Sequence, residues 1–376
     1  MSASLIARTE ERKSRRNQKG IERSLPNEIA SLSFADNDYL GLSRHPRVAE
    51  AAIQAIRDFG TGARAARHLA GLCPVHARLE KALAAWKGTE AALVFASGYQ
   101  TPLGVIPALI GPKDTVLLER NAHACLFDGA RLSGARLRLF IRNQPASLEE
   151  ALASAHQLNP DGKVLLVAES LHSMDGTFLD LKTLVTLKTR FGAWLLLDEA
   201  HAHGVVGPRG TGWAAEHGLQ DGVDIHMGTL GKAFGSSGGF IATSSSVTHH
   251  LLNEARTFLF STAPSPAAMA AAEEGLEIIR SEEGEALRRK LRENLRLFSS
   301  RHTDSRAGPI QPRVLQTNEA VLGARDFLRS HGIEVAAIRP PTVPENTARL
   351  RISLSARHCD QDLQSLANAL AQLPTA

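Results

Sequence analysis

Two short segments of this 376-residue chain carry side chains suited to covalent and acid–base chemistry. Lys232 lies in the glycine-rich stretch TLGKAFGSSGG (229–239), and Asp198 comes directly after the apolar run WLLL (194–197). An amine held in a pocket can form a Schiff base with an aldehyde, and a buried carboxylate can keep a heteroaromatic nitrogen protonated. Each residue alone is common in solvated loops and helix caps, so a site is predicted only if the fold brings both together.

Other apolar runs also end in residues able to contact a ligand. These are Gly98 and Tyr99 after 91–96, His123 after 116–118, Ser170 at the end of 164–170, His201 after 194–197, and Thr229 at the end of 223–229. In open parallel sheets, ligands bind at the carboxyl ends of the strands, so we expect these residues to meet there. The turn at Gly98 precedes a helical pattern and could hold a phosphate on its backbone N–H groups. With Lys232 and Asp198, the set predicts pyridoxal 5′-phosphate (PLP) as cofactor.

The elements that must position these residues alternate along the chain. Helical apolar spacing covers 46–59, 74–87 and 180–191, the last with Asp180 as N-cap. Between and after these helices lie the short apolar runs already named, together with GFIATS (239–244). Short continuous apolar runs separated by helices predict buried parallel strands. The expected fold is therefore α/β, with a mostly parallel central sheet and helices on both faces.

Three segments are predicted. Residues 1–44 form an N-terminal segment, with a polar helix over 1–25 and a short strand and turn within 31–43. Residues 45–266 form the large cofactor-binding domain. Residues 267–376 form a smaller α+β domain, with one long charged helix over 267–299 and a strand over 348–355.

Composition excludes several classes of protein. Hydrophobic residues make up 43% and charged residues 22%, which excludes a disordered chain. The three Cys contain no CxxC pair, so neither a disulfide scaffold nor a thiolate zinc site is expected. The net charge of +4 is too small to indicate nucleic acid, and no apolar run reaches the roughly 18 residues of a membrane span. The basic N-terminus lacks the apolar stretch of a signal peptide, so a cytoplasmic location is expected.

Residues 198–201 spell DEAH, which also occurs in helicases, but no phosphate-binding GxxxxGK[ST] accompanies it. His201 and His203 with Asp198 lack a third fixed ligand, so no metal site is predicted.

The order of these motifs resembles a known family. DEAHAHGVVGPRGTG (198–212) with TLGKAFGSSGG is similar to the α-oxoamine synthase group of fold-type-I PLP enzymes. The resemblance covers nearly the whole chain and includes NDYLGLS (37–43), GTGARAARHLAG (60–71), HACLFDGARLS (123–133), ESLHSMDGT (169–177) and FLFSTAPSP (258–266). The chain departs from the family pattern at Ala63 and Ala66, where Ser or Gly is common. The segment 337–358, AIRPPTVPENTARLRISLSARH, most resembles members that condense L-alanine with a pimeloyl thioester in biotin synthesis.

The resemblance implies roles around the cofactor. Lys232 would hold PLP and remove the Cα proton of the amino acid, Asp198 would pair with the pyridine nitrogen, and His123 would stack on the ring. Ser170 and His201 would contact the phenolic oxygen, and Thr229 with the Gly98 and Tyr99 backbone would line the phosphate end and the pocket. Ser261 and Thr262 match positions that contact the phosphate of the partner subunit. A homodimer with shared active sites is therefore implied.

The resemblance also implies substrate contacts. Arg351 would bind the amino-acid carboxylate, with Arg349, two residues earlier on the same predicted strand, as the alternative. Thr342 would touch the acyl substrate, and Arg23 is the nearest match to an N-terminal arginine that contacts substrate in the family. The implied reaction is a decarboxylative condensation of L-alanine with pimeloyl-CoA or pimeloyl-acyl carrier protein.

Alternatives stay open at this point. One is another α-oxoamine synthase, such as glycine C-acetyltransferase. A different class is a non-catalytic partner subunit of the same fold, which is disfavoured because Lys232 is present. The acyl carrier, coenzyme A or acyl carrier protein, is not decided by the sequence.

Overall fold

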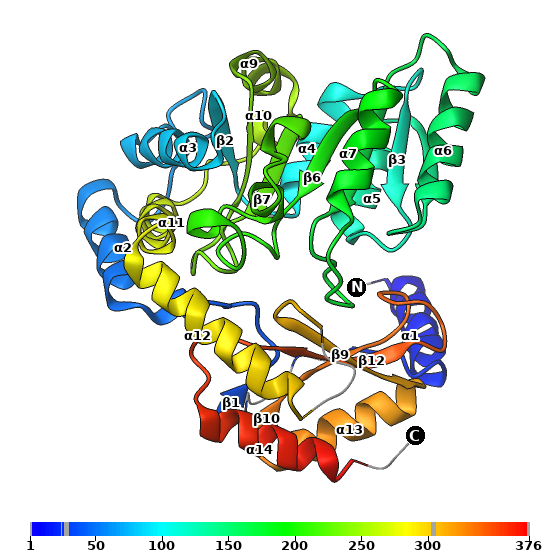
Figure 1. Cartoon of the computed structure of the whole chain (residues 1–376), viewed down its shortest axis with the longest axis vertical. Coiled ribbons are helices and arrows are strands. Elements are labelled where there is room, and N and C mark those ends of the chain that lie inside the picture. The colour runs from blue at the N-terminus through cyan, green and yellow to red at the C-terminus, as the bar shows by residue number, and fades with distance from the viewer. Residues whose placement is uncertain (1, 24, 26–29, 302–305, 374–376) are drawn as a thin grey trace.

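The computed structural model describes residues 2–23, 25, 30–301 and 306–373. Its central element is a seven-stranded sheet in the order β2-β8-β7-β6-β5-β3-β4 (Figure 1). The strands are β2 (Ala91–Phe95), β3 (Thr115–Glu119), β4 (Arg136–Phe140), β5 (Val164–Glu169), β6 (Trp194–Asp198), β7 (Ile225–Thr229) and β8 (Gly239–Thr243). This confirms the α/β fold with a mostly parallel sheet.

Helices cover both faces of this sheet. They are α2 (Pro46–Phe59), α3 (Pro74–Lys87), α4 (Gln100–Leu109), α5 (Ala124–Leu132), α6 (Pro145–Leu158), α7 (Leu181–Arg190), α8 (Trp213–Glu216), α9 (Ser245–Glu254), α10 (Arg256–Leu259) and α11 (Pro266–Ile279). Successive residues of β5 point to opposite faces of the sheet and pack against different helices. Leu165 and Val167 pack with residues of α4, α5, α9 and α10, and Leu166 and Ala168 pack with residues of α6 and α7.

The sequence expectations for the large sheet needed two corrections. The run 239–244 is a strand, but β8 pairs antiparallel with both β7 and β2. Only residues 230–238 join β7 to β8, too few for the crossover that a parallel pair requires. The edge strand β4 was not predicted, because its RLRLF sequence alternates charged and apolar residues instead of forming a continuous apolar run.

A smaller three-stranded antiparallel sheet lies below the large one in Figure 1. It has the order β11-β12-β9 and consists of β9 (Ile310–Gln316), β11 (Ala336–Ile338) and β12 (Ala348–Ser353). The surrounding helices are α12 (Glu282–Ser299), α13 (Asn318–Ser330) and α14 (Asp360–Ala371). The N-terminal segment joins this part, because β1 (Leu32–Ser33) pairs parallel with β10 (Ile333–Glu334). The division into domains at residues 44 and 266 stays a prediction.

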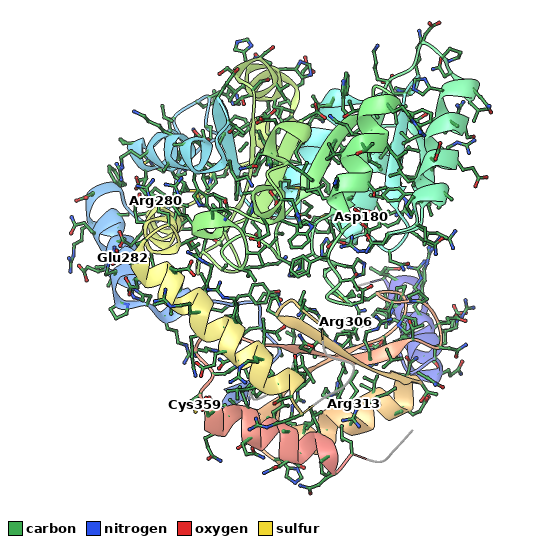
Figure 2. All side chains as sticks on the ribbon, viewed as in Figure 1. Asp180, Arg280, Glu282, Arg306, Arg313 and Cys359 are labelled. Atoms are coloured by element: carbon green, nitrogen blue, oxygen red, sulfur yellow. The ribbon has the colours of Figure 1, made fainter. Side chains whose placement is uncertain are left out.

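The single long helix predicted over 267–299 is wrong. The structure has two helices, α11 and α12, separated at Arg280 and Ser281; Figure 2 labels Arg280, within the break, and Glu282, the first residue of α12. The Ser281 hydroxyl caps α12 by accepting from the Gly284 N–H, and the buried Arg288 guanidinium donates to the carbonyl of Ile279, the last residue of α11. A Ser followed by acidic residues is an N-cap signal that the charge pattern concealed.

The N-terminal helix α1 spans Ala3–Gln18, shorter than the predicted 1–25. Within the described ranges, no helix is both long and apolar enough to cross a membrane.

Candidate active site

The predicted residues come together at the carboxyl edge of the large sheet. Asp198 ends β6, Ser170 follows β5, Thr229 ends β7 with Lys232 three residues later, and His123 precedes α5 after β3. Gly98 follows β2 and lies against the β7 end, where an added Cβ would meet the Thr229 hydroxyl at 2.9 Å. The close approach explains why this position carries no side chain.

A chain of hydrogen bonds leads away from the Lys232 amine. Its Nζ lies 2.7 Å from His201 Nε2, and His201 Nδ1 lies 2.6 Å from the hydroxyl of Tyr39. The hydroxyl in turn donates to Asn37 Oδ1 at 3.1 Å. Because this hydroxyl has one proton, His201 must donate from Nδ1, which leaves Nε2 as the acceptor for the lysine. The imidazole is therefore neutral here and orients the amine.

The electrostatics of the site favour proton exchange near neutral pH. Burial lowers the pKa of Lys232 to about 8, against the opposing charges of Asp198 and Glu169. Burial, reinforced by the negative charge of Glu169, raises the pKa of Asp198 to about 7. Burial also lowers the pKa of His201 well below its ordinary value, with Lys232 adding to the effect. Strongly shifted groups in contact are typical of catalytic sites.

His123 is positioned at its backbone and at its ring. Its N–H donates to Glu169 Oε2 at 3.0 Å, and its Nδ1 lies 2.9 Å from Cys125 Sγ and accepts from the Cys125 N–H. Desolvation lowers the pKa of His123, so the ring is neutral in the folded protein at neutral pH.

Arg351 lies on β12 and is held in a fixed position. It is 4% exposed, and its guanidinium donates to the Ser173 carbonyl (2.6 Å), to the Ser353 hydroxyl (2.8 Å) and to Asn37 Oδ1 (2.9 Å). Through Asn37, Arg351 joins the chain of hydrogen bonds that ends at the Lys232 amine. Arg349, the alternative, bonds only to the nearby Thr347 carbonyl among the described residues.

A cleft of ≈ 800 Å³ opens beside His123. His123 and Tyr99 line it from the large sheet's side, and Arg23 and Thr342 line it from the segments around the smaller sheet. Arg23 donates to the Thr342 hydroxyl at 3.0 Å, so two residues predicted separately, 319 positions apart, meet directly.

Ser261 and Thr262 do not line this cleft. They follow α10, and the next residue, Ala263, donates its N–H to the Ala65 carbonyl. Their role toward a partner subunit stays a prediction.

Several residues near Lys232 and Asp198 were not predicted as site residues. Asn37 and Tyr39 belong to the NDYLGLS motif (37–43), where an amide and a phenol beside the apolar Leu40 and Leu42 were a usable signal. Glu169, the last residue of β5, is another such residue. The fully buried Glu199, next to Asp198, faces away from Lys232 and pairs with Lys87 at 2.6 Å.

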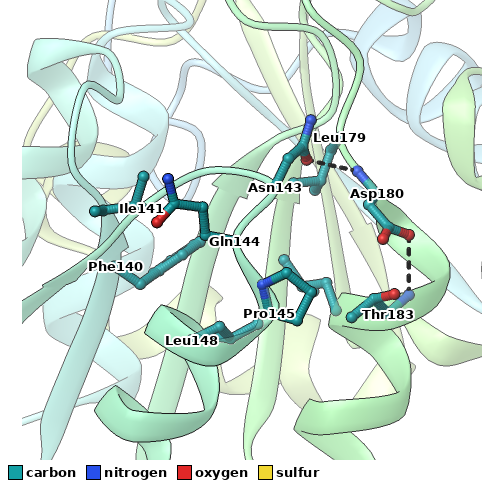
Figure 3. Close-up of a pocket in the computed structure, with 10 residues that line it drawn as sticks. Phe140, Ile141, Asn143, Gln144, Pro145, Leu148, Leu179, Asp180 and Thr183 are labelled. Carbon is teal, nitrogen blue, oxygen red and sulfur yellow. Dashed lines mark hydrogen bonds between the residues drawn. The ribbon is translucent and has the colours of Figure 1, made fainter.

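A second hollow, shown in Figure 3, is too small for a cofactor. Its volume of ≈ 20 Å³ holds little more than one water molecule. Asn143 Oδ1 accepts from the Asp180 N–H beside it, and Asp180 caps α7 by accepting from Thr183. The N-cap predicted at Asp180 is confirmed, and this hollow belongs to the capping structure.

The donor set fits PLP. Asp198 Oδ1 accepts from the Ala200 N–H, whereas Oδ2 receives no hydrogen bond from any described residue. A buried carboxylate with a free oxygen and a raised pKa suits a protonated ring nitrogen, and the nearby amine of Lys232 suits an aldehyde. Within the described part of the chain, no cluster of His, Cys, Asp and Glu is arranged to hold a metal ion.

Comparisons with known proteins agree with this geometry. A family model described as Aminotransferase class I and II matches residues 30–370. The 8-amino-7-oxononanoate synthase of Geobacter sulfurreducens is 42% identical over 348 residues, covering 90% of this chain and 88% of that protein. Serine palmitoyltransferase from S. paucimobilis, solved with a bound PLP–myriocin aldimine, has a TM-score of 0.88 at 26% identity, covering 98% of this chain and 96% of that one.

A solved 8-amino-7-oxononanoate synthase from Francisella tularensis has a TM-score of 0.77 at 24% identity, covering 92% of this chain and 98% of that one, and shares the fold. The fold and the site thus define a PLP-dependent enzyme of the class I and II aminotransferase type. Within that class, the chain belongs to the family of 8-amino-7-oxononanoate synthases, which are acyltransferases.

Proposed function

We propose that this protein condenses L-alanine with a pimeloyl thioester, releasing CO2 and free thiol and forming 8-amino-7-oxononanoate for biotin synthesis. The observation that carries the proposal is that Lys232, hydrogen-bonded to His201, acts electrostatically on His123, and that His123 lines a cleft together with Arg23 and Thr342. Similarity to 8-amino-7-oxononanoate synthases over about nine-tenths of the chain supports the choice of substrates. The acyl carrier is coenzyme A or acyl carrier protein, and the expected location is the cytoplasm.

PLP, when bound, supplies an electron sink for the carbon that is deprotonated and acylated. Lys232 would hold the cofactor and then act as the base at the amino-acid Cα, for which a pKa of about 8 is suited. Asp198 would keep the ring nitrogen protonated, and His123 would stack on the ring. Ser170 and His201 would bond the phenolic oxygen, and Thr229, Gly98 and Tyr99 would line the phosphate end.

Substrate groups would be bound by residues of the smaller sheet and of the N-terminal segment. Arg351 would bind the carboxylate of L-alanine, since its guanidinium can form two parallel hydrogen bonds. Asn37 would orient that guanidinium through its 2.9 Å bond. Arg23 and Thr342 would contact the acyl thioester from the outer wall of the cleft. Tyr39 bonds to His201 on the side of Lys232 and to Asn37 on the side of Arg351. It would therefore fix the position of the amine relative to the guanidinium that binds the carboxylate.

We further propose a homodimer in which Ser261 and Thr262 contact the phosphate held by the partner subunit. Phosphate contacts from a second chain would make each active site incomplete in a monomer.

The test is release of thiol and CO2 by the purified protein supplied with PLP. L-alanine with pimeloyl-CoA is compared with glycine and acetyl-CoA, and Lys232→Ala is compared with the exposed-lysine control Lys81→Ala. We expect turnover of the first pair only, abolished by Lys232→Ala and kept by Lys81→Ala. Turnover of glycine with acetyl-CoA instead would replace the substrates, and no turnover of either pair would contradict the proposal.

A further inference from the structure

Three arginines are among the described residues that line the cleft: Arg23, Arg120 and Arg131. Asp128 is the one acidic residue among the described residues of that lining. Two of the arginines already have partners. Arg23 donates to the Thr342 hydroxyl at 3.0 Å, and Arg131 pairs with Asp128 at 3.3 Å and lies 5.8 Å from the centroid of the Phe127 ring.

Arg120 differs from both. Its guanidinium makes no hydrogen bond, ion pair or ring contact with any residue in the described ranges. The residue is exposed and lines both this cleft and a neighbouring hollow that Arg138 and Glu150 also line. Its backbone is nonetheless fixed, because its N–H donates to the Phe140 carbonyl at 2.9 Å and the next turn is closed by Ala122 bonding to Glu119. All the guanidinium donors of Arg120 are therefore available to an anionic group.

The position of Arg120 relates it directly to the reacting end of the cleft. It comes three residues before His123 in the same turn, so their Cα atoms are at most about 11 Å apart. The cleft that both residues line also has apolar lining residues suited to methylene groups, namely Ala124, Phe127, Met174, Pro341 and Val343. An acyl chain with a second carboxylate presents apolar carbons followed by an anion, in that order.

We propose that Arg120 selects the acyl thioester by pairing with the distal carboxylate of its dicarboxylic chain. The inference rests on the proposed function and adds the residue that reads the acyl group. The six C–C bonds between the two carboxyl carbons of a pimeloyl group, at about 1.5 Å each, span at most about 9 Å. A chain of this length lies within the greatest Cα separation that three residues allow between His123 and Arg120, so one acyl chain can extend from the first residue toward the second. Arg131 would have to leave Asp128 to do the same, and Arg23 already donates to Thr342.

The test compares pimeloyl-CoA with heptanoyl-CoA, which has the same chain length and no distal carboxylate. Both are assayed with L-alanine on the PLP-loaded wild type, Arg120→Gln and the matched variant Arg131→Gln. In Arg120→Gln we expect kcat/KM for pimeloyl-CoA to fall about 10- to 100-fold, with less than about a twofold change for heptanoyl-CoA. Arg131→Gln should keep the wild-type preference. Arg120→Lys, which retains the charge without the bidentate fork, should be intermediate and serves if the Gln variant fails to fold.

A binding measurement separates this inference from the proposed function. Calorimetry should show that free pimelate binds the wild type more tightly than heptanoate does, and that Arg120→Gln loses the difference. This result stands even if the wild type turns over neither thioester, which would contradict the proposed function alone. An unchanged pimelate preference in Arg120→Gln, a loss in Arg131→Gln instead, or no pimelate preference in the wild type would each overturn the role of Arg120.

Discussion

At the scale of single residues, the environment of Lys232 sets when its amine is available. An ordinary lysine has a pKa near 10.5, but burial lowers that of Lys232 to about 8. Only the neutral amine can attack the cofactor aldehyde. In its proposed role, Lys232 would therefore capture PLP at pH values where exposed lysines remain protonated.

We expect the rate at which the apo protein captures PLP to rise with pH around a midpoint near 8. The rate is measured from the growth of the cofactor absorption band after mixing, over a series of buffers. Lys232→Ala should show no such phase, which identifies the lysine. A midpoint near 10.5 would show that the amine behaves as if fully solvated.

A second pair of residues links stability to pH. His172 Nδ1 lies 3.1 Å from Asp175 Oδ1 in the loop after β5. Burial of the ring lowers the pKa of His172, but the hydrogen bond to Asp175 and the charges of Glu169 and Glu119 outweigh it and raise the pKa to about 9. The protonated His172 thus stabilises the fold fully below its unfolded pKa of 6.5, and this contribution is lost as pH rises through about 9.

We expect the free energy of unfolding of the wild type to fall by up to about 3 kcal/mol more than that of Asp175→Asn between pH 6.5 and 9. Urea unfolding at both pH values measures the difference. Since Asp175 also has a lowered pKa, its own contribution persists until the pH falls below the ordinary range of a carboxyl. Equal slopes for the two proteins would contradict the assignment.

At the scale of elements, the break between α11 and α12 depends on a glycine. A Cβ on Gly284 would lie 2.3 Å from the Ile278 carbonyl oxygen and 2.4 Å from that of Ile279. These are backbone atoms and cannot move aside as a flexible side chain can. The first turn of α12 therefore packs directly on the end of α11.

Gly284→Ala should destabilise the protein by about 1–3 kcal/mol, because the helix start must shift away from these carbonyls. Gly323→Ala, in α13, is the matched control, since nothing lies within 4 Å of its added Cβ. The control should gain up to about 1 kcal/mol from reduced backbone freedom in the unfolded chain. Urea unfolding curves of both variants test this, and equal effects would refute the packing argument.

At the scale of the whole molecule, the proposed dimer makes a specific prediction about shared sites. If Ser261 and Thr262 serve the partner's site, then Lys232→Ala and the double variant Ser261→Ala/Thr262→Ala damage the same site from different chains. A mixed dimer would then retain one intact site.

Unfolding and refolding an equal mixture of the two inactive proteins should restore about a quarter of the wild-type activity. Half of the dimers would be mixed, each with one of two sites complete. The control is each variant refolded alone, which should stay inactive. If a mixture shown to contain mixed dimers recovered no activity, Lys232 and the Ser261–Thr262 pair would not act on one site from different chains, and the proposed sharing would be contradicted.

Much of the local structure followed from the sequence. The ranges of α2, α3 and α7, the cap at Asp180 and the strands β5 to β7 were predicted nearly to the residue. Helical spacing, capping side chains and continuous apolar runs are local properties, and these segments are long and buried enough for the pattern to be unambiguous. The order of motifs likewise indicated Lys232, Asp198 and the cofactor before any geometry was known.

Tertiary structure alone decided how distant segments combine. Three features depend on residues that are far apart in the sequence. β8 runs antiparallel to β7. Arg351, not Arg349, bonds to Asn37, and Tyr39 bonds to His201, which completes the hydrogen-bond chain to Lys232. Local propensity is the same for either strand direction and for either arginine. Packing of the whole chain determines which polar groups share a buried space, and there unpaired groups are costly enough to select a single arrangement.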